Sequence, residues 1–401
     1  MKVIRFLKIF FLILTGIAFH LNCIGQPGCP DIDAGPDVIL DSTGCTTLFA
    51  TAIETGTTTN YNPTSIAYIP PYPFDTGTQV LTNIDDTWSG VINLPFTFCF
   101  FGIAYNQLVA GSNGCVSFST TNSGAYCGWS FTVSCPDPTI ISGSTGPFIL
   151  GPYHDLYPAV TGNMYYNIYG SYPCRMFVLN FYQVPMYSCN TLLATHQIVL
   201  YETTNIIEVY IQNAPVCTTW NSGNKCIGIQ DAAGTLGYSP PGRNTGAWSA
   251  TNEAWRFTPN GVPNYSISWW QGGTLIANGD SVTVCPTNTT TYTAQIVYDC
   301  CTGTQVTVTD DVNVNAGSGI NDEVNSNNNI YIMPNPAYDR VYIKTPEKNY
   351  TIEIYDFTGR KLLKENPAND QSIDISELAK GTYLFRITNG KETFINKIIK
   401  N

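Results

Sequence analysis

The feature that most restricts the fold of this chain is an alternation of apolar and polar residues, interrupted at short intervals by Gly, Pro, Asn and Asp. The segment THQIVLYETTNIIEVYIQN shows it well, because Gln197–Tyr201 and Ile206–Ile211 flank the polar Thr203-Thr204-Asn205. Successive side chains of a strand face opposite sides, so this segment predicts a β-hairpin. Helical periodicity is nearly absent from the rest of the chain, and we expect an all-β protein.

The N-terminal 25 residues have the features of a removed signal peptide. Three basic residues lie within the first eight positions, and the apolar stretch Ile9–Leu21 follows them. This stretch is short for a membrane span, and no other segment is long and apolar enough for one. We expect cleavage between Gly25 and Gln26; a lipoprotein site at Cys23 is the alternative, although the preceding Asn fits it poorly.

Strand spacing and composition divide the mature chain into four parts. We expect a large, disulfide-containing β-sandwich over residues 26–260, whose opening segment DIDAGPDVILDSTGCTTLFAT forms a small lobe or joins the main sheet. Residues 261–316 contain five short strand patterns, typical of an immunoglobulin-like sandwich. Residues 317–329 have too few large apolar side chains to fold and predict a linker. Residues 330–401 predict a small all-β domain.

The charge of the body excludes several classes of partner. Residues 26–319 carry four basic against eighteen acidic residues, a net charge of −14, whereas residues 320–401 carry eleven of each sign. A surface with so few cations cannot neutralise phosphates, so nucleic acid is excluded as a partner and an anionic membrane surface is disfavoured.

Thirteen cysteines remain after removal of the signal peptide, and all lie between Cys29 and Cys301. In an exported chain they predict a disulfide framework, whereas clustered zinc-type spacing is missing. Because the number is odd, we expect Cys300 or Cys301 to be free or linked to another chain. The spacings favour local pairs: Cys29–Cys45, Cys99–Cys115, Cys127–Cys135, Cys174–Cys189, Cys217–Cys226, and Cys285 with Cys300 or Cys301.

The C-terminal segments MPNPAYDRVYI, YDFTGRKLL and LAKGTYLFRI…NKIIK resemble, in order and spacing, the type A C-terminal sorting domain of the type IX secretion system. The resemblance implies a seven-stranded immunoglobulin-like sandwich that addresses a periplasmic protein to an outer-membrane translocon. It also implies removal by a sorting protease and delivery to the cell surface or the medium. By motif position, the residues expected to matter for recognition are Pro334, Asn335, Pro336, Gly359, Arg360, Lys361, Gly381, Tyr383 and Lys397.

Five body segments resemble a nidogen-like extracellular domain, beginning with INLPFTFCFFGIAYNQLVAGSNGCVSF and FILGPYHDLYPAVTGNMYYNIYG and followed in order by RMFVLNFYQVPMY, HQIVLYE and IGIQDAAGTLGYSPP. The segment GPYHD departs from the family, which usually has an aromatic pair around Trp there. Together with the module behind it, this arrangement is similar to surface proteins of gliding motility and adhesion. The resemblance therefore implies a binding function.

Signs of catalysis are few. His154-Asp155 is the main candidate for an imidazole–carboxylate pair, whereas His196 at a strand edge fits a structural role. No nucleophile elbow is present, and the glycine-rich Ser142–Phe148 has no phosphate-binding lysine. Glu202 and Glu208 flank one hairpin turn and are the acids that a secreted glycosidase would use. We expect no enzyme, with such a glycosidase as the alternative.

Hard oxygen ligands at short spacing make calcium a candidate cofactor, and no other cofactor is expected. The candidates are Asp31, Asp33 and Asp37, and the pair Asp310-Asp311. Aromatic residues are abundant, and part of them are candidates for a sugar-stacking surface: Tyr165, Tyr166, Tyr169, Tyr182, Tyr187, Trp129, Trp220 and Trp248.

Together these features predict an exported surface or secreted binding and adhesion protein with a sorting tail. Its expected partners are the translocon, the sorting protease and a surface or glycan ligand. A glycan-active hydrolase and a structural matrix or filament subunit are the alternatives.

Overall fold

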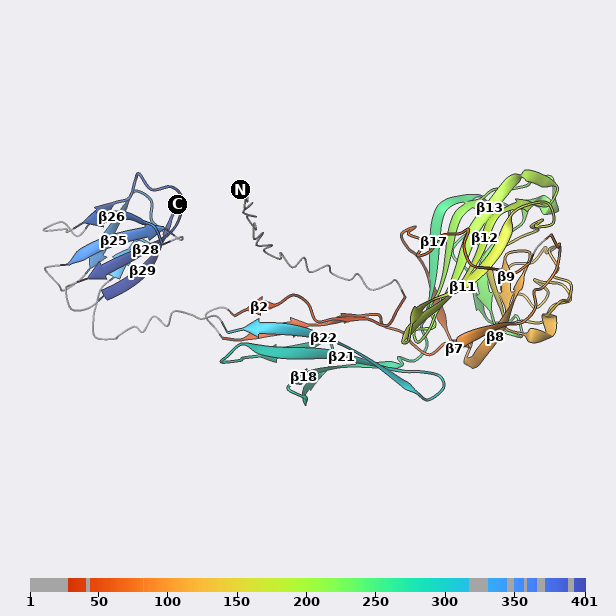
Figure 1. Cartoon of the computed structure of the whole chain (residues 1–401), viewed down its shortest axis with the longest axis horizontal. Coiled ribbons are helices and arrows are strands. Elements are labelled where there is room, and N and C mark those ends of the chain that lie inside the picture. Colours follow the sequence, from red (N-terminus) through yellow and green to blue (C-terminus); the bar gives the residue numbers. More distant parts are fainter. Residues whose placement is uncertain are drawn as a thin grey trace, which may run out of the picture. The chain divides into compact units, whose positions relative to one another are not determined.

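The structure is a computed structural model that describes residues 28–40, 44–81, 83–316, 331–344, 350–356, 359–365, 372–388 and 393–401. Its regular elements are β-strands and two short 3-10 helices, Thr120–Asn122 and Asn221–Gly223 (Figure 1), so the all-β expectation is confirmed. No helix in this part of the chain is long and apolar enough to cross a membrane. The expected signal peptide, its Gly25–Gln26 cleavage site and the linker over 317–329 lie outside the described residues.

The chain forms two compact units, Met1–Ala316 and Gly317–Asn401. Most of the first unit is a sandwich of a seven-stranded sheet, in the order β5-β17-β14-β13-β12-β11-β6, and a six-stranded sheet, in the order β16-β15-β10-β9-β8-β7 (Figure 1). The strands of the first sheet are β5 (Tyr61–Ser65), β6 (Thr78–Gln79), β11 (Asn163–Ser171), β12 (Cys174–Met186), β13 (Cys189–Tyr201), β14 (Ile207–Ala214) and β17 (Ala250–Pro259). Those of the second are β7 (Ile92–Phe100), β8 (Ile103–Gly111), β9 (Cys115–Ser117), β10 (Phe148–Tyr153), β15 (Cys226–Gln230) and β16 (Gly237–Tyr238).

The core lies between these sheets. Phe98 and Ile149 of the six-stranded sheet pack in one cluster with Phe177 and Ile198 of the seven-stranded sheet, and all four side chains are fully buried. The predicted hairpin is confirmed as β13 paired with β14 in antiparallel register. Its turn places Thr203 in the left-handed backbone region, at a φ of 66°.

A smaller module follows the sandwich and contains the five predicted strands, with Trp269 fully buried in its core. Strands from the start of the chain complete it: Val38 pairs with Val314, and Leu48 pairs with Val282. The expected boundary therefore needs correction, because the strands within residues 32–40 and 44–52 join this module rather than the sandwich. The strands are β1 (Ile32–Asp33), β2 (Val38–Ile39), β3 (Thr46–Phe49), β4 (Thr51–Ala52), β18 (Tyr265–Gln271), β19 (Thr274–Asn278), β20 (Ser281–Val284), β21 (Thr290–Asp299) and β22 (Gln305–Asn315).

Among the described residues, three of the four disulfides link distant parts of the chain, the fourth joins cysteines 28 residues apart, and the expected local pairs are wrong. The four bonds are Cys29–Cys174, Cys45–Cys285, Cys99–Cys301 and Cys189–Cys217. The physical reason is that segments 145 to 240 residues apart become neighbours in the fold, as Cys29–Cys174 and Cys45–Cys285 show. Cys300 is free, as expected for one of the vicinal pair, and the other free thiols among the described residues are the buried Cys115, Cys127, Cys135 and Cys226.

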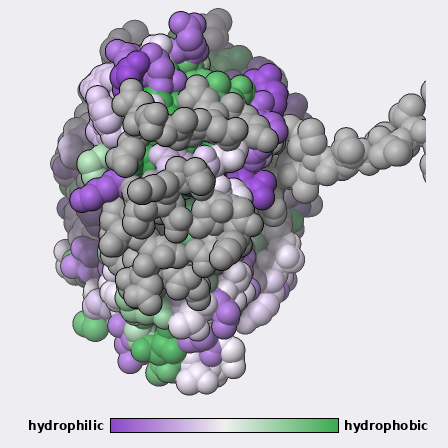
Figure 2. Space-filling model, turned by 90° about the vertical axis from the view of Figure 1, so that its left-hand side faces the viewer, coloured by the Kyte–Doolittle hydropathy of each residue, from purple (hydrophilic) through white to green (hydrophobic). Residues whose placement is uncertain are grey.

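The described residues of the second unit form seven strands in two sheets, in the orders β23-β24-β27 and β26-β25-β28-β29. Ile354 and Phe385 are fully buried in its core. On the face drawn in Figure 2, hydrophilic and hydrophobic residues of the described part are interspersed, as on ordinary protein surfaces. The strands are β23 (Tyr331–Met333), β24 (Arg340–Lys344), β25 (Thr351–Asp356), β26 (Lys361–Glu365), β27 (Ser372–Asp374), β28 (Gly381–Thr388) and β29 (Thr393–Lys400).

Candidate functional site

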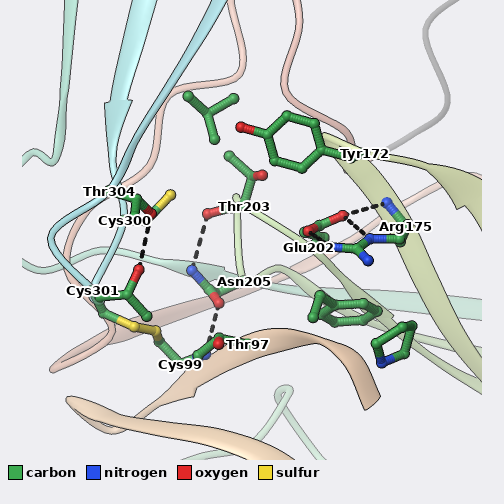
Figure 3. A pocket seen from close by; sticks show the side chains of 14 residues that line it. Thr97, Cys99, Tyr172, Arg175, Glu202, Thr203, Asn205, Cys300, Cys301 and Thr304 are labelled. Atoms are coloured by element: carbon green, nitrogen blue, oxygen red, sulfur yellow. Dashed lines mark hydrogen bonds and ion pairs between the residues drawn. A yellow bond between two sulfur atoms is a disulfide. The ribbon is translucent and has the colours of Figure 1, made fainter.

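A pocket of about 420 Å³ lies where the sandwich meets the module (Figure 3). Strand β7 contributes one wall, and the turns that follow β11 and β13 contribute a second. The turn between β21 and β22 of the module closes the third side. Residues from positions 95 to 306 therefore meet in one cavity, which only the folded chain creates.

An ion pair between Arg175 and Glu202 dominates the electrostatics of the pocket. Arg175 Nε donates to Glu202 Oε2 at 2.8 Å, and Arg175 Nη2 donates to Oε1 at 2.5 Å. This two-pronged geometry is the strongest arrangement for the pair, and the hydrogen bonds to Glu202 raise the pKa of Arg175. The guanidinium also lies 5.8 Å from the centroid of the Phe96 ring, which favours a cation.

The turn after β13 is held rigidly by its own side chains. Asn205 Oδ1 accepts a 2.7 Å hydrogen bond from the backbone N–H of Cys99, and Asn205 Nδ2 donates to the carbonyl of Thr203. Thr203 Oγ1 donates to the carbonyl of Pro173 at 2.8 Å. The Cys99–Cys301 disulfide then joins this wall to the module. The pocket is therefore largely preformed.

The rim of the pocket offers an aromatic ring and hydroxyl groups. Tyr172 is 64% exposed and stands above the ion pair in Figure 3. Across the pocket, Thr302 and Thr304 bring their hydroxyl oxygens to 2.9 Å from each other, beside the half-buried thiol of Cys300. Such a mixture of a flat apolar surface, hydroxyls and a paired charge suits a polar ligand without net charge.

His154 and Asp155, the candidate imidazole–carboxylate pair, do not contact each other through a hydrogen bond between their side chains. Asp155 Oδ2 accepts a 2.6 Å hydrogen bond from Trp220 Nε1, and neither ring nitrogen of the fully buried His154 has a partner among the described residues. Burial, with Lys225 and His196 nearby, lowers the pKa of His154 well below its usual value. Asp155 therefore does not orient His154 as a base.

His196 is structural in this arrangement. Its ring stacks on Phe181 with centroids 4.3 Å apart, and burial lowers its pKa to about 3. A neutral, stacked imidazole in the core fits the structural role that the sequence suggested.

Glu202 and Glu208, the acids of the glycosidase alternative, are bound by different arginines. Glu208 is fully buried and accepts 2.7 Å hydrogen bonds from the hydroxyls of Tyr201 and Tyr210 and from Arg256 Nε. Glu202 is bound by Arg175 in the pocket. Each glutamate thus has its own arginine partner, although both belong to the β13–β14 hairpin.

The five calcium candidates of the sequence are engaged in other contacts. Asp33 accepts from the N–H of Gly35 and Asp310 from that of Ala34, while Asp37 accepts from Asn313 and Asp311 from Thr293. Burial, with Asp33 and Asp310 nearby, raises the pKa of Asp31. Within the described residues, these carboxylates do not bring three ligand atoms together. Asp85, Asp86 and Asp155 do so elsewhere in the sandwich.

The predicted aromatic surface is assembled in part. Trp220 packs against Trp129 and Tyr187, with ring centroids 5.3 Å and 4.7 Å apart. Trp248 instead lies beneath the cations of Arg243 and Lys225. Within the part of the chain that the structure describes, Trp220, Trp129 and Tyr187 are thus the predicted aromatic residues whose rings pack against one another.

Sequence reasoning missed Tyr172 and Arg175. The signal for Arg175 was its rarity, because an arginine in a body with four basic residues is expected to have a specific acidic partner. Tyr172 gave no such signal, since it lies in the short turn between β11 and β12, where the strand pattern does not indicate exposure.

In the tail, the expected recognition residues fall into two groups. Asn335 Oδ1 accepts from the backbone N–H of Ile399 and Asn335 Nδ2 donates to the carbonyl of Lys397, both at 2.9 Å, so Asn335 fixes strand β29. Tyr383 is buried and donates to the carbonyl of Ala379. Pro334, Pro336, Gly359, Arg360, Lys361, Gly381 and Lys397 are exposed.

Comparisons with known proteins match both parts of the chain. The family described as NIDO related matches residues 60–269, and the secretion system C-terminal sorting domain matches residues 329–401. No curated protein sequence matches the chain significantly. The first match therefore includes the pocket residues of the sandwich, and the second covers the tail.

Two solved structures show only remote similarity. PorZ, a surface component of the type-IX secretion system of Porphyromonas gingivalis, is 10% identical and aligns over 78% of this chain and 66% of its own, with a TM-score of 0.17. The BSP domain of a biofilm-associated protein is 11% identical and aligns over 93% of this chain and 81% of its own, with a TM-score of 0.15. Scores this low carry no argument about function.

Proposed function

Because this chain belongs to the NIDO-related family and ends in a type IX secretion system C-terminal sorting domain, we propose that it is an adhesion protein that binds a neutral saccharide in the pocket beside Tyr172. The sorting domain marks the chain for export to the cell surface or the extracellular space. Such a protein meets glycans of its own matrix or of other surfaces. A binding role thus agrees with its destination.

The observation that supports the proposal is the position of Tyr172 above the Arg175–Glu202 ion pair (Figure 3). A sugar ring has an apolar C–H face, which stacks on an aromatic ring, and hydroxyl groups, which donate to a carboxylate and accept from a guanidinium. Because Arg175 and Glu202 neutralise each other, the pocket favours a ligand without net charge.

The composition of the pocket favours binding over hydrolysis. Glycoside hydrolysis needs two carboxyl groups about 5–10 Å apart. Among the described residues that line this pocket, Glu202 is the one carboxylic acid, and Arg175 contacts both of its oxygens. A glycosidase would need a second acid from outside this set.

A panel of neutral oligosaccharides and polysaccharides tests the proposal. We expect the purified chain to bind members of the panel without releasing new reducing ends. Turnover that is lost in Glu202→Gln would support the hydrolase alternative. Self-association without any saccharide binding would support a matrix or filament subunit.

We also propose that the translocon and its sorting protease recognise the tail. The tail is a compact unit with its own buried core, and Arg360, Lys361 and Lys397 are exposed on it, the first two paired with Asp356 and Glu353. Their charge contrasts with the acidic body, which has few cations to offer.

A further inference from the structure

Three carboxylates of the sandwich meet at a place that the saccharide pocket does not involve. One oxygen each of Asp85, Asp86 and Asp155 lies within 4.8 Å of the others. Asp85 and Asp86 precede the fully buried Trp88, and Asp155 follows strand β10. Two segments about 70 residues apart thus direct acidic groups to one point.

Asn113 holds these segments in place. Its Nδ2 donates to Asp86 Oδ1 at 2.9 Å, and its Oδ1 accepts from the backbone N–H of Leu156, the residue after Asp155, at 2.9 Å. Asn113 is fully buried, and its carbonyl also accepts from the N–H of His154. The positions of the carboxylates are therefore built into the fold.

Asp155 has an oxygen that the protein leaves without a donor. The residue is 6% exposed, Oδ2 accepts from Trp220 Nε1, and Oδ1 is buried with no hydrogen-bond partner among the described residues. A buried carboxylate oxygen without a partner is costly and calls for a cation, a proton or a bound water.

No basic side chain of the body compensates the three acids. Each of its four basic residues contacts another group: Arg175 contacts Glu202, Arg243 contacts Glu253, Arg256 contacts Glu208, and Lys225 donates to the carbonyl of Pro215. Burial, followed by repulsion from the other two acids, raises the pKa of Asp155 to about 7, although its bond from Trp220 opposes that shift.

We propose that Asp85, Asp86 and Asp155 bind a calcium ion. Ca²⁺ prefers carboxylate, carbonyl and water oxygens, and two oxygens that both bind it at about 2.4 Å lie at most about 4.8 Å apart. The spacing of the three acids meets this limit. Their charge and the unpaired Oδ1 of Asp155 supply the attraction.

The ion ties the segment before Trp88 to the end of β10. It also sits next to the cluster of Trp220, Trp129 and Tyr187, because Trp220 donates to the same Asp155 carboxylate. Calcium binding is therefore expected to change the tryptophan fluorescence as well as the stability of the sandwich.

The test adds CaCl₂ to the full chain after treatment with a chelator, and follows the midpoint of thermal unfolding and the heat of binding. We expect one ion per chain, with a dissociation constant of about 10⁻⁴ to 10⁻³ M, the range of extracellular sites. Saturating calcium should raise the midpoint by several degrees. MgCl₂ at the same concentration should have a much smaller effect.

The variant Asp85→Asn is the main probe, because Asp85 is partly exposed and the substitution leaves the bond between Asp155 and Trp220 intact. We expect at least tenfold weaker calcium binding in this variant. The matched control is Asp33→Asn combined with Asp310→Asn, which should bind calcium as the wild type does.

Three results would overturn the proposal: a wild-type chain that binds no calcium at about 10 mM, binding that is unchanged in Asp85→Asn, or binding that is lost in the control. If Asp85→Asn fails to fold, displacement of Tb³⁺ by Ca²⁺ on the wild type decides instead. Terbium emission excited through tryptophan is then expected, and its absence would contradict a site beside Trp220.

Discussion

Cys99 in strand β7 of the sandwich is bonded to Cys301 in a turn of the module, 202 positions further along the chain. The same turn carries Cys300, Thr302 and Thr304 into the pocket. This bond therefore sets the distance between the two walls of the proposed saccharide site.

Replacement of both Cys99 and Cys301 by Ser tests this role. Loss of a native disulfide commonly lowers the free energy of unfolding by about 2–5 kcal/mol, and it frees the turn that forms one wall. We expect a lower thermal midpoint together with weaker saccharide binding. Cys300→Ser, which leaves the bond intact, serves as the control. An equal loss of saccharide binding in both variants would argue against a role of the Cys99–Cys301 bond in shaping the pocket.

Thiol labelling tests the distribution of free cysteines. Cys300 is half-buried, whereas the other four free thiols are buried in the sandwich. In the mature chain, which has lost Cys23 with the expected signal peptide, we expect a maleimide to modify Cys300 alone in the folded state, slowly because burial raises its pKa. After unfolding without reductant, it should modify five cysteines. Mass spectrometry of the peptides gives the answer. Modification of Cys115 or Cys127 in the folded chain would contradict the packing.

Because the amine of Lys225 is buried, we expect the free energy of unfolding to depend on pH. Its side chain is buried beside Trp248, and burial, with Arg243 nearby, lowers its pKa from 10.5 to about 7. The unfolded chain then binds one more proton than the folded chain between these values, so stability rises with pH in that window, by up to about 1.4 kcal/mol per pH unit.

Denaturant unfolding at pH 7.5 and pH 9.5 measures this effect. The rise should be smaller in Lys225→Met, which keeps the apolar stem without the titrating amine. Equal pH dependence in the two proteins would mean that Lys225 stays charged in the fold.

We expect the contacts of Asn335 to stabilise the tail and thereby to support export. Its side chain makes two hydrogen bonds to the backbone of β29, each contributing about 1 kcal/mol. Asn335→Ala should destabilise the tail and leave more of the protein in the periplasm, as measured by the exported fraction. Tyr338→Ala changes a side chain that is 65% exposed nearby and is the control for local surface changes. Full export of an Asn335→Ala protein with a destabilised tail would show that sorting does not depend on the stability of the tail.

Local features of the fold were predictable from the sequence. The hairpin of β13 and β14 follows from alternation within 19 residues, and the Trp269 core follows from the strand that contains it. The tail motifs likewise lie within single strands and turns. Such features depend on neighbouring residues only, so they can be predicted without knowledge of the tertiary contacts.

Relationships across the sheets were not predictable in this way. The pairing of Val38 with Val314 depends on the chain leaving the module, building the sandwich and returning. The same holds for the Cys45–Cys285 bond and for the meeting of Asp85 with Asp155. Alternation specifies which residues are buried, but it does not specify which distant strand lies beside them.

The most direct test of the proposed function compares saccharide affinity of the wild type with that of Tyr172→Ala, by calorimetry on the best member of the neutral panel. The matched control is Phe49→Ala, which removes a ring that is 65% exposed on the module. The proposed site predicts at least tenfold weaker binding for Tyr172→Ala, unchanged binding for the control and no turnover by any of the three. Unchanged affinity in a folded Tyr172→Ala protein would contradict the pocket as the binding site.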